Sequence, residues 1–162
     1  MDYFTSHGST INLCALDMSK VFGKVNHYAL FNKLMDRQVP REVLTTHITW
    51  HSLSAAFVRW ENLFSDMITV TCAVRQGGVL SPVLFAVYVN DLIEKLSRSG
   101  HGCRIGKMYL GCVMFADDLI LISASLYDLQ AMVDICSVEL EGIDMKLNVA
   151  KSHSDKDWTT FP

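Results

Sequence analysis

Apolar and polar positions divide the first half of the chain into extended and helical segments. Residues 11–17, INLCALD, form an apolar run that ends in an aspartate, which predicts a buried strand. Apolar side chains recur at helical spacing over residues 24–38 and again over residues 41–52, with a Val-Pro pair between the two predicted helices. Two β-prone runs between residues 55 and 74 flank the polar stretch ENLFSD, which predicts a pair of strands around a turn.

The second half of the chain predicts a long helix, a hairpin and a further helix. Ser81 is a suitable N-cap, and the proline after it a suitable first residue, for a helix that runs to about Ser97. The first half of this helix is apolar nearly all round, so we expect it to be buried. Apolar runs flank ADD at 116–118, which predicts a β-hairpin with both aspartates at its tip. Residues 125–128, SLYD, resemble a capping box that opens a helix to about Glu141.

The order of these elements predicts an α+β fold with a mainly antiparallel sheet. Helices and strands mix without regular βαβ repetition, and residues 142–152 add strand and loop. Apolar residues on one side of the helix at 126–141 predict that it faces the core. The length of 162 residues suits one domain with a substantial hydrophobic core.

Composition narrows the class of protein. Half of the residues are apolar and mean hydropathy is +0.23, which indicates a generous core or surfaces made to meet other parts. A net charge of −3 argues against strong autonomous binding of nucleic acid, because proteins that grip phosphates are usually basic. The five cysteines are scattered without a C-x-x-C pair, which indicates reduced thiols. The sequence shows no signal-peptide pattern and no membrane-spanning run, so we expect a cytoplasmic or nuclear protein, neither secreted nor membrane-bound.

The paired carboxylates Asp117 and Asp118 interrupt an apolar run, VMFADDLILI. At about 4 Å and an effective dielectric constant near 20, two like charges repel by about 4 kcal/mol. An exposed turn, a shared proton, a nearby Arg or Lys, or a metal ion could each offset this repulsion. Taken by itself, the pair is most simply a solvated turn between two strands.

Two further segments of the chain add to the evidence from this pair of carboxylates. A predicted strand ends in Asp17, and a Gln-Gly-Gly turn precedes the apolar helix. If the strand and the hairpin are neighbours in one sheet, three carboxylates meet, and oxygen ligands of this kind bind hard divalent cations. Two such cations about 4 Å apart can activate a 3′-hydroxyl and neutralise a leaving pyrophosphate in an in-line displacement. In isolation, Asp17 could equally be a helix N-cap and RQGG an ordinary glycine loop.

Four segments together resemble the palm motifs A, B, C and D of reverse transcriptases, and most closely those of non-LTR (LINE-type) retrotransposons. In chain order they are LDMSKVFGKVNH at 16–27, RQGGVLSPVLFAVYVNDL at 75–92, FADD at 115–118 and GIDMKLNVAKS at 142–152. FADD alone is moderately specific, whereas the four motifs in this order are highly specific. The resemblance covers roughly residues 3–152. It implies a polymerase palm, in which helices pack on one face of a mainly antiparallel sheet.

The resemblance also implies roles for individual residues. Asp17, Asp117 and Asp118 would be the catalytic carboxylates and metal ligands, and Met18 would offer its main-chain carbonyl to a metal. Lys151 would donate a proton to the departing pyrophosphate. The residues that would contact the incoming nucleotide or line its pocket are Lys20, Phe22, Arg75, Gln76 and Gly77. Among them the bulky phenylalanine would be the gate that rejects a ribose 2′-hydroxyl.

Simpler interpretations stay open for several of these residues. Lys20 and Lys151 could be ordinary surface lysines, and Phe22 could be a core residue. His47 and His51 have the i, i+4 spacing of metal ligands, but no third ligand follows at a fitting distance, which favours an amphipathic helix face.

The chain departs from the family pattern at motif A and at both ends. The family usually reads SKAFD where this chain reads SKVFG, so Val21 replaces a small alanine and Gly23 replaces an aspartate. Because glycine loosens the backbone, we expect nucleotide positioning to change. Few residues precede motif A and residues 153–162 are unlike the family, so we expect a palm fragment over residues 1–152, followed by a disordered tail, without fingers or thumb.

These features imply a fragment of an RNA-directed DNA polymerase that transfers deoxynucleotides to a primer 3′-end with two Mg²⁺ ions, for which Mn²⁺ could substitute. The full-length ancestor would bind an RNA template, a DNA primer and dNTPs. We expect the isolated chain to bind nucleic acid weakly and to have little or no activity, because catalysis depends on positioning. The alternative is a non-catalytic retrotransposon relic that acts at most as an interaction fragment and binds no divalent cation. A receiver-like α/β domain is disfavoured, because its acidic pair would follow the first strand.

Overall fold

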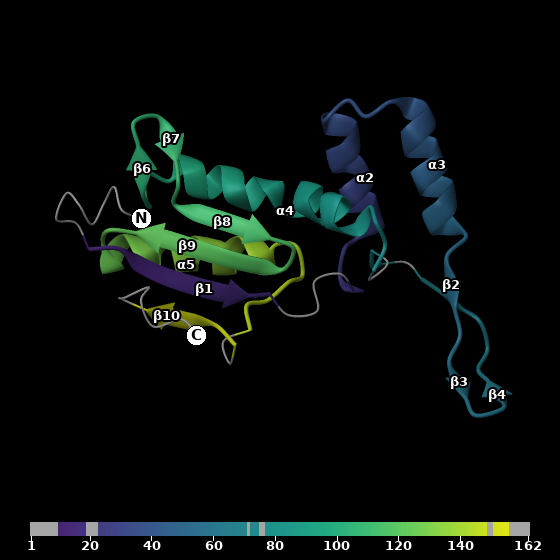
Figure 1. Ribbon diagram of the computed structural model, residues 1–162. Helices are drawn as coiled ribbons and strands as arrows, with labels where there is room; N and C mark the ends of the chain where they lie inside the picture. Colours follow the sequence, from purple (N-terminus) through teal and green to yellow (C-terminus); the bar gives the residue numbers. More distant parts are fainter. Residues whose placement is uncertain (1–9, 19–22, 71, 75–76, 149–150, 156–162) are drawn as a thin grey trace. The chain divides into compact units, whose positions relative to one another are not determined.

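The computed structural model describes residues 10–18, 23–70, 72–74, 77–148 and 151–155 (Figure 1). Its contacts divide the chain into two compact units. Unit 1 comprises residues 1–21 and 89–162, and unit 2 comprises residues 22–88. The pattern of residues along the chain predicts a single palm fragment and gives no sign of these boundaries.

Unit 1 is built on a four-stranded antiparallel sheet with the strand order β10-β1-β9-β8 (Figure 1). Its strands are β1 (Asn12–Asp17), β8 (Cys112–Phe115), β9 (Asp118–Ser123) and β10 (His153–Asp155). Strand β1 pairs with β9 along its whole length, from Asn12 opposite Ser123 to Asp17 opposite Asp118. The predicted strand at 11–17, the hairpin and the antiparallel sheet are therefore confirmed.

Strand β10 corrects the expected start of the tail. The unfamiliar sequence from residue 153 onward predicts disorder, yet Ala15 pairs with His153 and Leu13 with Asp155. Main-chain hydrogen bonds to β1 form this ladder, and they require no particular side chain. Three residues are also too short a run to show a strand pattern. The remainder of the predicted tail, residues 156–162, lies outside the described residues.

The core of unit 1 lies between the sheet and helix α5 (Leu126–Glu141), which covers one face of the sheet (Figure 1). The cross-strand pairs Leu16–Leu119 and Cys14–Leu121 are buried, as side chains two apart on a strand share one face. Helix α5 contributes buried residues at helical spacing, as its pattern predicts: Leu129, Met132, Cys136 and Leu140. This burial of apolar area is the main stabilising contribution to the unit.

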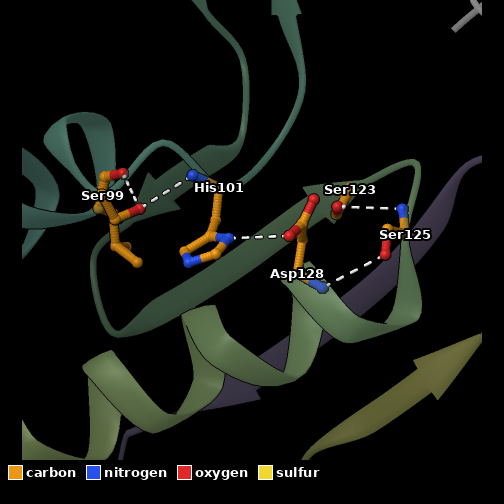
Figure 2. A network of polar contacts seen from close by, with 6 residues as sticks. Ser99, His101, Ser123, Ser125 and Asp128 are labelled. Carbon is orange, nitrogen blue, oxygen red and sulfur yellow. Dashed lines mark hydrogen bonds and ion pairs between the residues drawn. The ribbon is translucent and has the colours of Figure 1, made fainter.

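A polar network fixes the N-terminus of α5 (Figure 2). The Ser125 hydroxyl accepts the Asp128 main-chain N–H at 3.4 Å, which confirms the predicted cap. The Asp128 carboxylate lies 2.8 Å from Nδ1 of His101. The His101 main-chain N–H in turn donates to Ser99 Oγ, and the Ser125 N–H donates to Ser123 Oγ. The contact between His101 and Asp128 thereby ties the loop that carries Ser99 and His101 to the first turn of α5.

A short hairpin, β6 (Arg104–Ile105) with β7 (Met108–Tyr109), precedes β8. The apolar pattern merges it with β8 into one predicted strand. Gly106 turns the chain with a φ of 58°, and Gly111 separates the hairpin from β8. A Cβ on Gly111 would lie 2.5 Å from three atoms of the Tyr109 side chain, so the ring can pack there only against a glycine.

Unit 2 begins with the two predicted helices, α2 (His27–Asp36) and α3 (Arg41–Ser52). The predicted strand pair that follows is a broken hairpin, in which β2 (Ala55–Ala56) pairs with β5 (Ile68–Thr69) and β3 (Arg59–Trp60) pairs with β4 (Leu63–Phe64). Every residue of these four short strands is exposed.

Helix α4 (Ser81–Arg98) follows, as predicted, and its first half belongs to unit 2. The expectation that this half is buried all round is wrong. Phe85 and Tyr88 are buried, but Val83 is 61% exposed. An apolar side chain shows that a position can be buried, not that a neighbour covers it. Within the described residues, no helix combines the length and apolar character that a membrane span needs.

Candidate active site

The pairing of β1 with β9 brings two acidic residues face to face. Asp17 is the last residue of β1, Asp118 is the first of β9, and the register makes them direct cross-strand partners. Side chains in such positions share one face of the sheet, with Cβ atoms about 4.5–5.5 Å apart. Like charges at this separation destabilise the ladder unless a cation or a hydrogen-bond donor offsets them.

The third carboxylate, Asp117, lies in the turn that joins β8 to β9. Its main-chain carbonyl accepts the Met18 N–H at 3.3 Å, which ties the turn to the end of β1. Ala116 precedes it with a φ of 52°, a conformation that suits a tight hairpin but is uncommon for a residue with a side chain. The prediction that both aspartates occupy the tip holds only for Asp117, because Asp118 already pairs within β9.

The predicted motif D segment also reaches this site. Leu147 forms an antiparallel bridge with the buried Met18. Asn148 donates from its main-chain N–H to the Asp17 carbonyl at 2.8 Å and from Nδ2 to Asp17 Oδ2 at 2.9 Å. Lys151 is exposed, and its main-chain N–H donates to the Asn148 carbonyl. The motif match includes Asn148 without indicating a role for it, so its contact with Asp17 is new information from the structure.

Of the five residues predicted to contact the nucleotide, one lies within the described residues. Lys20, Phe22, Arg75 and Gln76 lie outside the described residues. Gly77 is described, belongs to unit 2, and has a φ of 79° that favours glycine. The departures at motif A divide in the same way, because Val21 lies outside the described residues and Gly23 is exposed.

The donor atoms at the carboxylates fit a hard divalent cation. They are oxygens of Asp17, Asp117 and Asp118, with the Met18 carbonyl next in the chain. No group of three or more His, Cys, Asp or Glu in the described part of the chain is close enough to hold a metal ion by itself. Mg²⁺ does not need such a cage, because it usually takes one or two carboxylates and keeps waters and substrate phosphates as its other ligands.

Unit 2 contains a separate cluster of histidines. The rings of His27 and His51 lie 4.2 Å apart and those of His47 and His51 lie 6.4 Å apart, measured between centroids. His27 bonds through Nε2 to the Ala73 carbonyl at 2.7 Å, whereas His47 Nδ1 and His51 Nε2 are buried without a hydrogen-bond partner among the described residues. His27, Trp50 and His51 line a cavity of about 430 Å³. The spacing of His47 and His51 is visible in the sequence, but the third histidine is brought in only by the fold.

Comparison with known proteins connects this geometry to a family. Residues 2–157 match the family described as reverse transcriptase (RNA-dependent DNA polymerase). The chain is 26% identical over 145 residues to the retrovirus-related Pol polyprotein from the type-2 retrotransposable element R2DM of Drosophila melanogaster, covering 90% of this chain and 14% of that protein. It is 27% identical over 143 residues to the corresponding polyprotein from the type-1 element R2 of Nasonia vitripennis, covering 88% of this chain and 14% of the relative.

Solved structures agree on the fold. The apo telomerase from Candida tropicalis, truncated from its C-terminal domain, matches with a TM-score of 0.71 at 14% identity, over 99% of this chain and 34% of the telomerase chain. An identity this low shows a shared α+β fold and nothing about shared chemistry. The resemblance carried by the four sequence motifs is confirmed by the family match and the R2 relatives. The chain belongs to the reverse transcriptase (RNA-dependent DNA polymerase) family and is a domain of the non-LTR retrotransposon type.

Proposed function

We propose that this chain carries the catalytic carboxylates of an RNA-directed DNA polymerase, which adds deoxynucleotides to a primer 3′-end by two-metal transfer. The chain spans 14% of the length of its R2 relatives, so the activity belongs to a larger protein of that kind. The observation that carries the proposal is the cross-strand pair Asp17–Asp118, with Asp117 in the adjoining turn. These residues occupy the positions that match motifs A and C.

Each residue at the site has a role under this proposal. Asp17, Asp117 and Asp118 would hold two Mg²⁺ ions through carboxylate oxygens, and Met18 through its carbonyl. Bound there, the ions would supply Lewis acidity that activates the primer 3′-hydroxyl and neutralises charge on the leaving pyrophosphate. Lys151 would give a proton to an oxygen of the departing pyrophosphate.

Substrate and template contacts form the second part of the proposal. Lys20, Phe22, Arg75, Gln76 and Gly77 would contact the incoming dNTP and line its pocket, with Phe22 rejecting a ribose 2′-hydroxyl. An RNA template and a DNA primer would be the nucleic-acid partners. A solved telomerase from Candida tropicalis is in complex with a fragment of telomeric RNA, which supports this class of partner. The net charge of −3 supports weak binding of nucleic acid by this segment alone.

Divalent-cation binding tests the proposal most directly. We expect the 162-residue chain to bind Mn²⁺ saturably, as measured by electron paramagnetic resonance of the free ion. Asp17→Asn and Asp117→Asn should each abolish that binding, because each removes an anionic oxygen ligand. The matched control is Asp66→Asn, which removes the same charge from an exposed residue in unit 2 and should leave binding unchanged.

Primer extension on an RNA template provides the second measurement. We expect any extension by the isolated chain to be weak, to require Mg²⁺ or Mn²⁺, and to disappear in Asp117→Asn but not in Asp66→Asn. Mn²⁺ binding that persists in both site variants would contradict the proposal. A complete lack of binding would favour the alternative of a non-catalytic relic.

A further inference from the structure

We propose that Asn148 is a positioning residue, which holds the Asp17 carboxylate in the orientation that a divalent cation requires. This inference rests on the proposed function of Asp17 as a metal ligand. Its basis is a double contact: Asn148 donates its main-chain N–H to the Asp17 carbonyl at 2.8 Å and its side-chain Nδ2 to Asp17 Oδ2 at 2.9 Å. One residue therefore fixes both the main chain and the side chain of Asp17.

Asn148 can act in this way because its own place is fixed on both sides. Before it, Leu147 bridges Met18 and so aligns the segment with the end of β1. After it, the Asn148 carbonyl accepts the main-chain N–H groups of Lys151 and Ser152 at 3.1 and 3.0 Å, together with the Ser152 hydroxyl at 2.9 Å. The side chain of Asn148 is half-buried, which partly shields its bond to Asp17 from water.

The neutral amide of asparagine suits this task better than the charged side chain of a lysine or arginine would. The side-chain amide of Asn148 is a neutral donor, so its Nδ2–H restrains Oδ2 of Asp17 without cancelling the charge of the carboxylate. The other oxygen, Oδ1, keeps its lone pairs for a cation. A lysine or arginine in the same place would compete with the metal for the negative charge.

The restraint matters because Asp118 lies directly opposite Asp17. Before a cation binds, repulsion between the two carboxylates favours rotamers that turn them apart. The bond to Asn148 opposes that rotation and prepares the site for the ion. Groups that orient a metal ligand from behind typically account for about 10- to 100-fold in metal affinity.

The first experiment measures Mn²⁺ affinity of the 162-residue chain by electron paramagnetic resonance. We expect Asn148→Ala to weaken binding by about 10-fold. The matched control is Asn90→Ala, because Asn90 donates the same kind of bond, from Nδ2 to Glu94 Oε1 at 2.8 Å, on the exposed side of α4. The control should bind Mn²⁺ like the unaltered chain. Far-UV circular dichroism and the thermal midpoint report whether each variant is folded.

A second measurement leaves Asn148 unchanged and so does not depend on the folding of an Asn148 variant. The side-chain amide signals of Asn148 and Asn90 can be followed by NMR while Mg²⁺ is added to the unaltered chain. We expect the Asn148 signal to shift saturably and the Asn90 signal to stay in place. The shift should disappear in Asp17→Asn. An asparagine that only stabilises the loop would give no such Asp17-dependent signature.

The outcomes separate this inference from the function on which it rests. If the unaltered chain binds Mn²⁺ through Asp17 and Asn148→Ala binds it equally well, the positioning role is wrong and the proposed function stands. If the unaltered chain shows no binding that depends on Asp17, both are wrong. A weakened affinity in Asn148→Ala, together with the Mg²⁺-dependent shift of its amide in the unaltered chain, supports the positioning role.

Discussion

Asp17 and Asp118 form a pair that stability alone does not favour. Like charges directly opposite each other weaken a strand pairing, whereas the neighbouring pairs Leu16–Leu119 and Ala15–Ile120 are apolar. The Asn148 amide gives Asp17 a donor but leaves its charge in place. Proteins commonly accept such local costs where a site needs them. This unfavourable pair lies where the end of β1 pairs with the start of β9, and its presence there favours a functional role.

The histidine cluster of unit 2 leads to a prediction about pH. Burial, with the neighbouring His27 and His47, lowers the pKa of His51. The unfolded chain therefore binds a proton at this position more readily than the folded chain does. The stabilisation is complete above the ordinary histidine pKa of about 6.5 and is lost as pH falls through the lowered folded value. We expect the urea concentration at the unfolding midpoint to decrease as the pH is lowered from about 7.5 to about 5.5.

The variant His51→Gln tests the origin of this pH dependence, because glutamine is polar but does not titrate. It should flatten the decline of the urea midpoint on acidification. A decline of the same steepness in His51→Gln would show that other groups cause it.

At the scale of the element, helix α5 offers a matched pair of substitutions. Met132 is completely buried, whereas Val138 on the same helix is 66% exposed. We expect Met132→Ala to lower the free energy of unfolding by about 2–5 kcal/mol, since it leaves a cavity in the core of unit 1. Val138→Ala should change it by no more than about 0.5 kcal/mol. Urea unfolding measures both, and equal effects would contradict the packing of α5 on the sheet.

The elements differ in how well their residue pattern predicts them. Helices α3 and α5 begin and end at the predicted residues. Their starts are marked by local signals, which are a proline before Arg41 and the Ser125 cap. Strand β10 and the β6–β7 hairpin have no such signal. Strand β10 depends on main-chain pairing with β1, and the hairpin depends on its own pairing and on Gly111 next to the Tyr109 ring. Neither feature leaves much trace in the apolar pattern.

At the scale of the whole molecule, the high apolar content is not all accounted for by the core. The broken hairpin of unit 2 exposes large apolar side chains, among them Phe57, Trp60, Leu63 and Phe64. This exposure agrees with the second explanation of the high apolar content, which is that some apolar surfaces meet other parts of a protein. Exposed apolar strands of this kind also promote association between chains.

We therefore expect the protein to self-associate as its concentration rises. The double substitution Trp60→Ser and Leu63→Ser should reduce this association, because both side chains are more than two-thirds exposed, at 74% and 73%. The urea midpoint should stay nearly the same, since neither residue is buried. Sedimentation velocity at several concentrations measures the effect. If the double variant associates as strongly as the unaltered chain, the surface through which chains associate lies elsewhere.

The sequence by itself determined the family and the helices, and it singled out the three carboxylates as candidate site residues. It could do so because motif order, spacing and helix signals are properties of residues close together along the chain. Only the tertiary structure decided that Asp118 rather than Asp117 opposes Asp17, that His27 joins His47 and His51, and that Asn148 holds Asp17 from 131 positions away. Such contacts arise from strand register and chain folding, whose free energy is spread over many main-chain bonds and buried side chains and marks no single residue in advance.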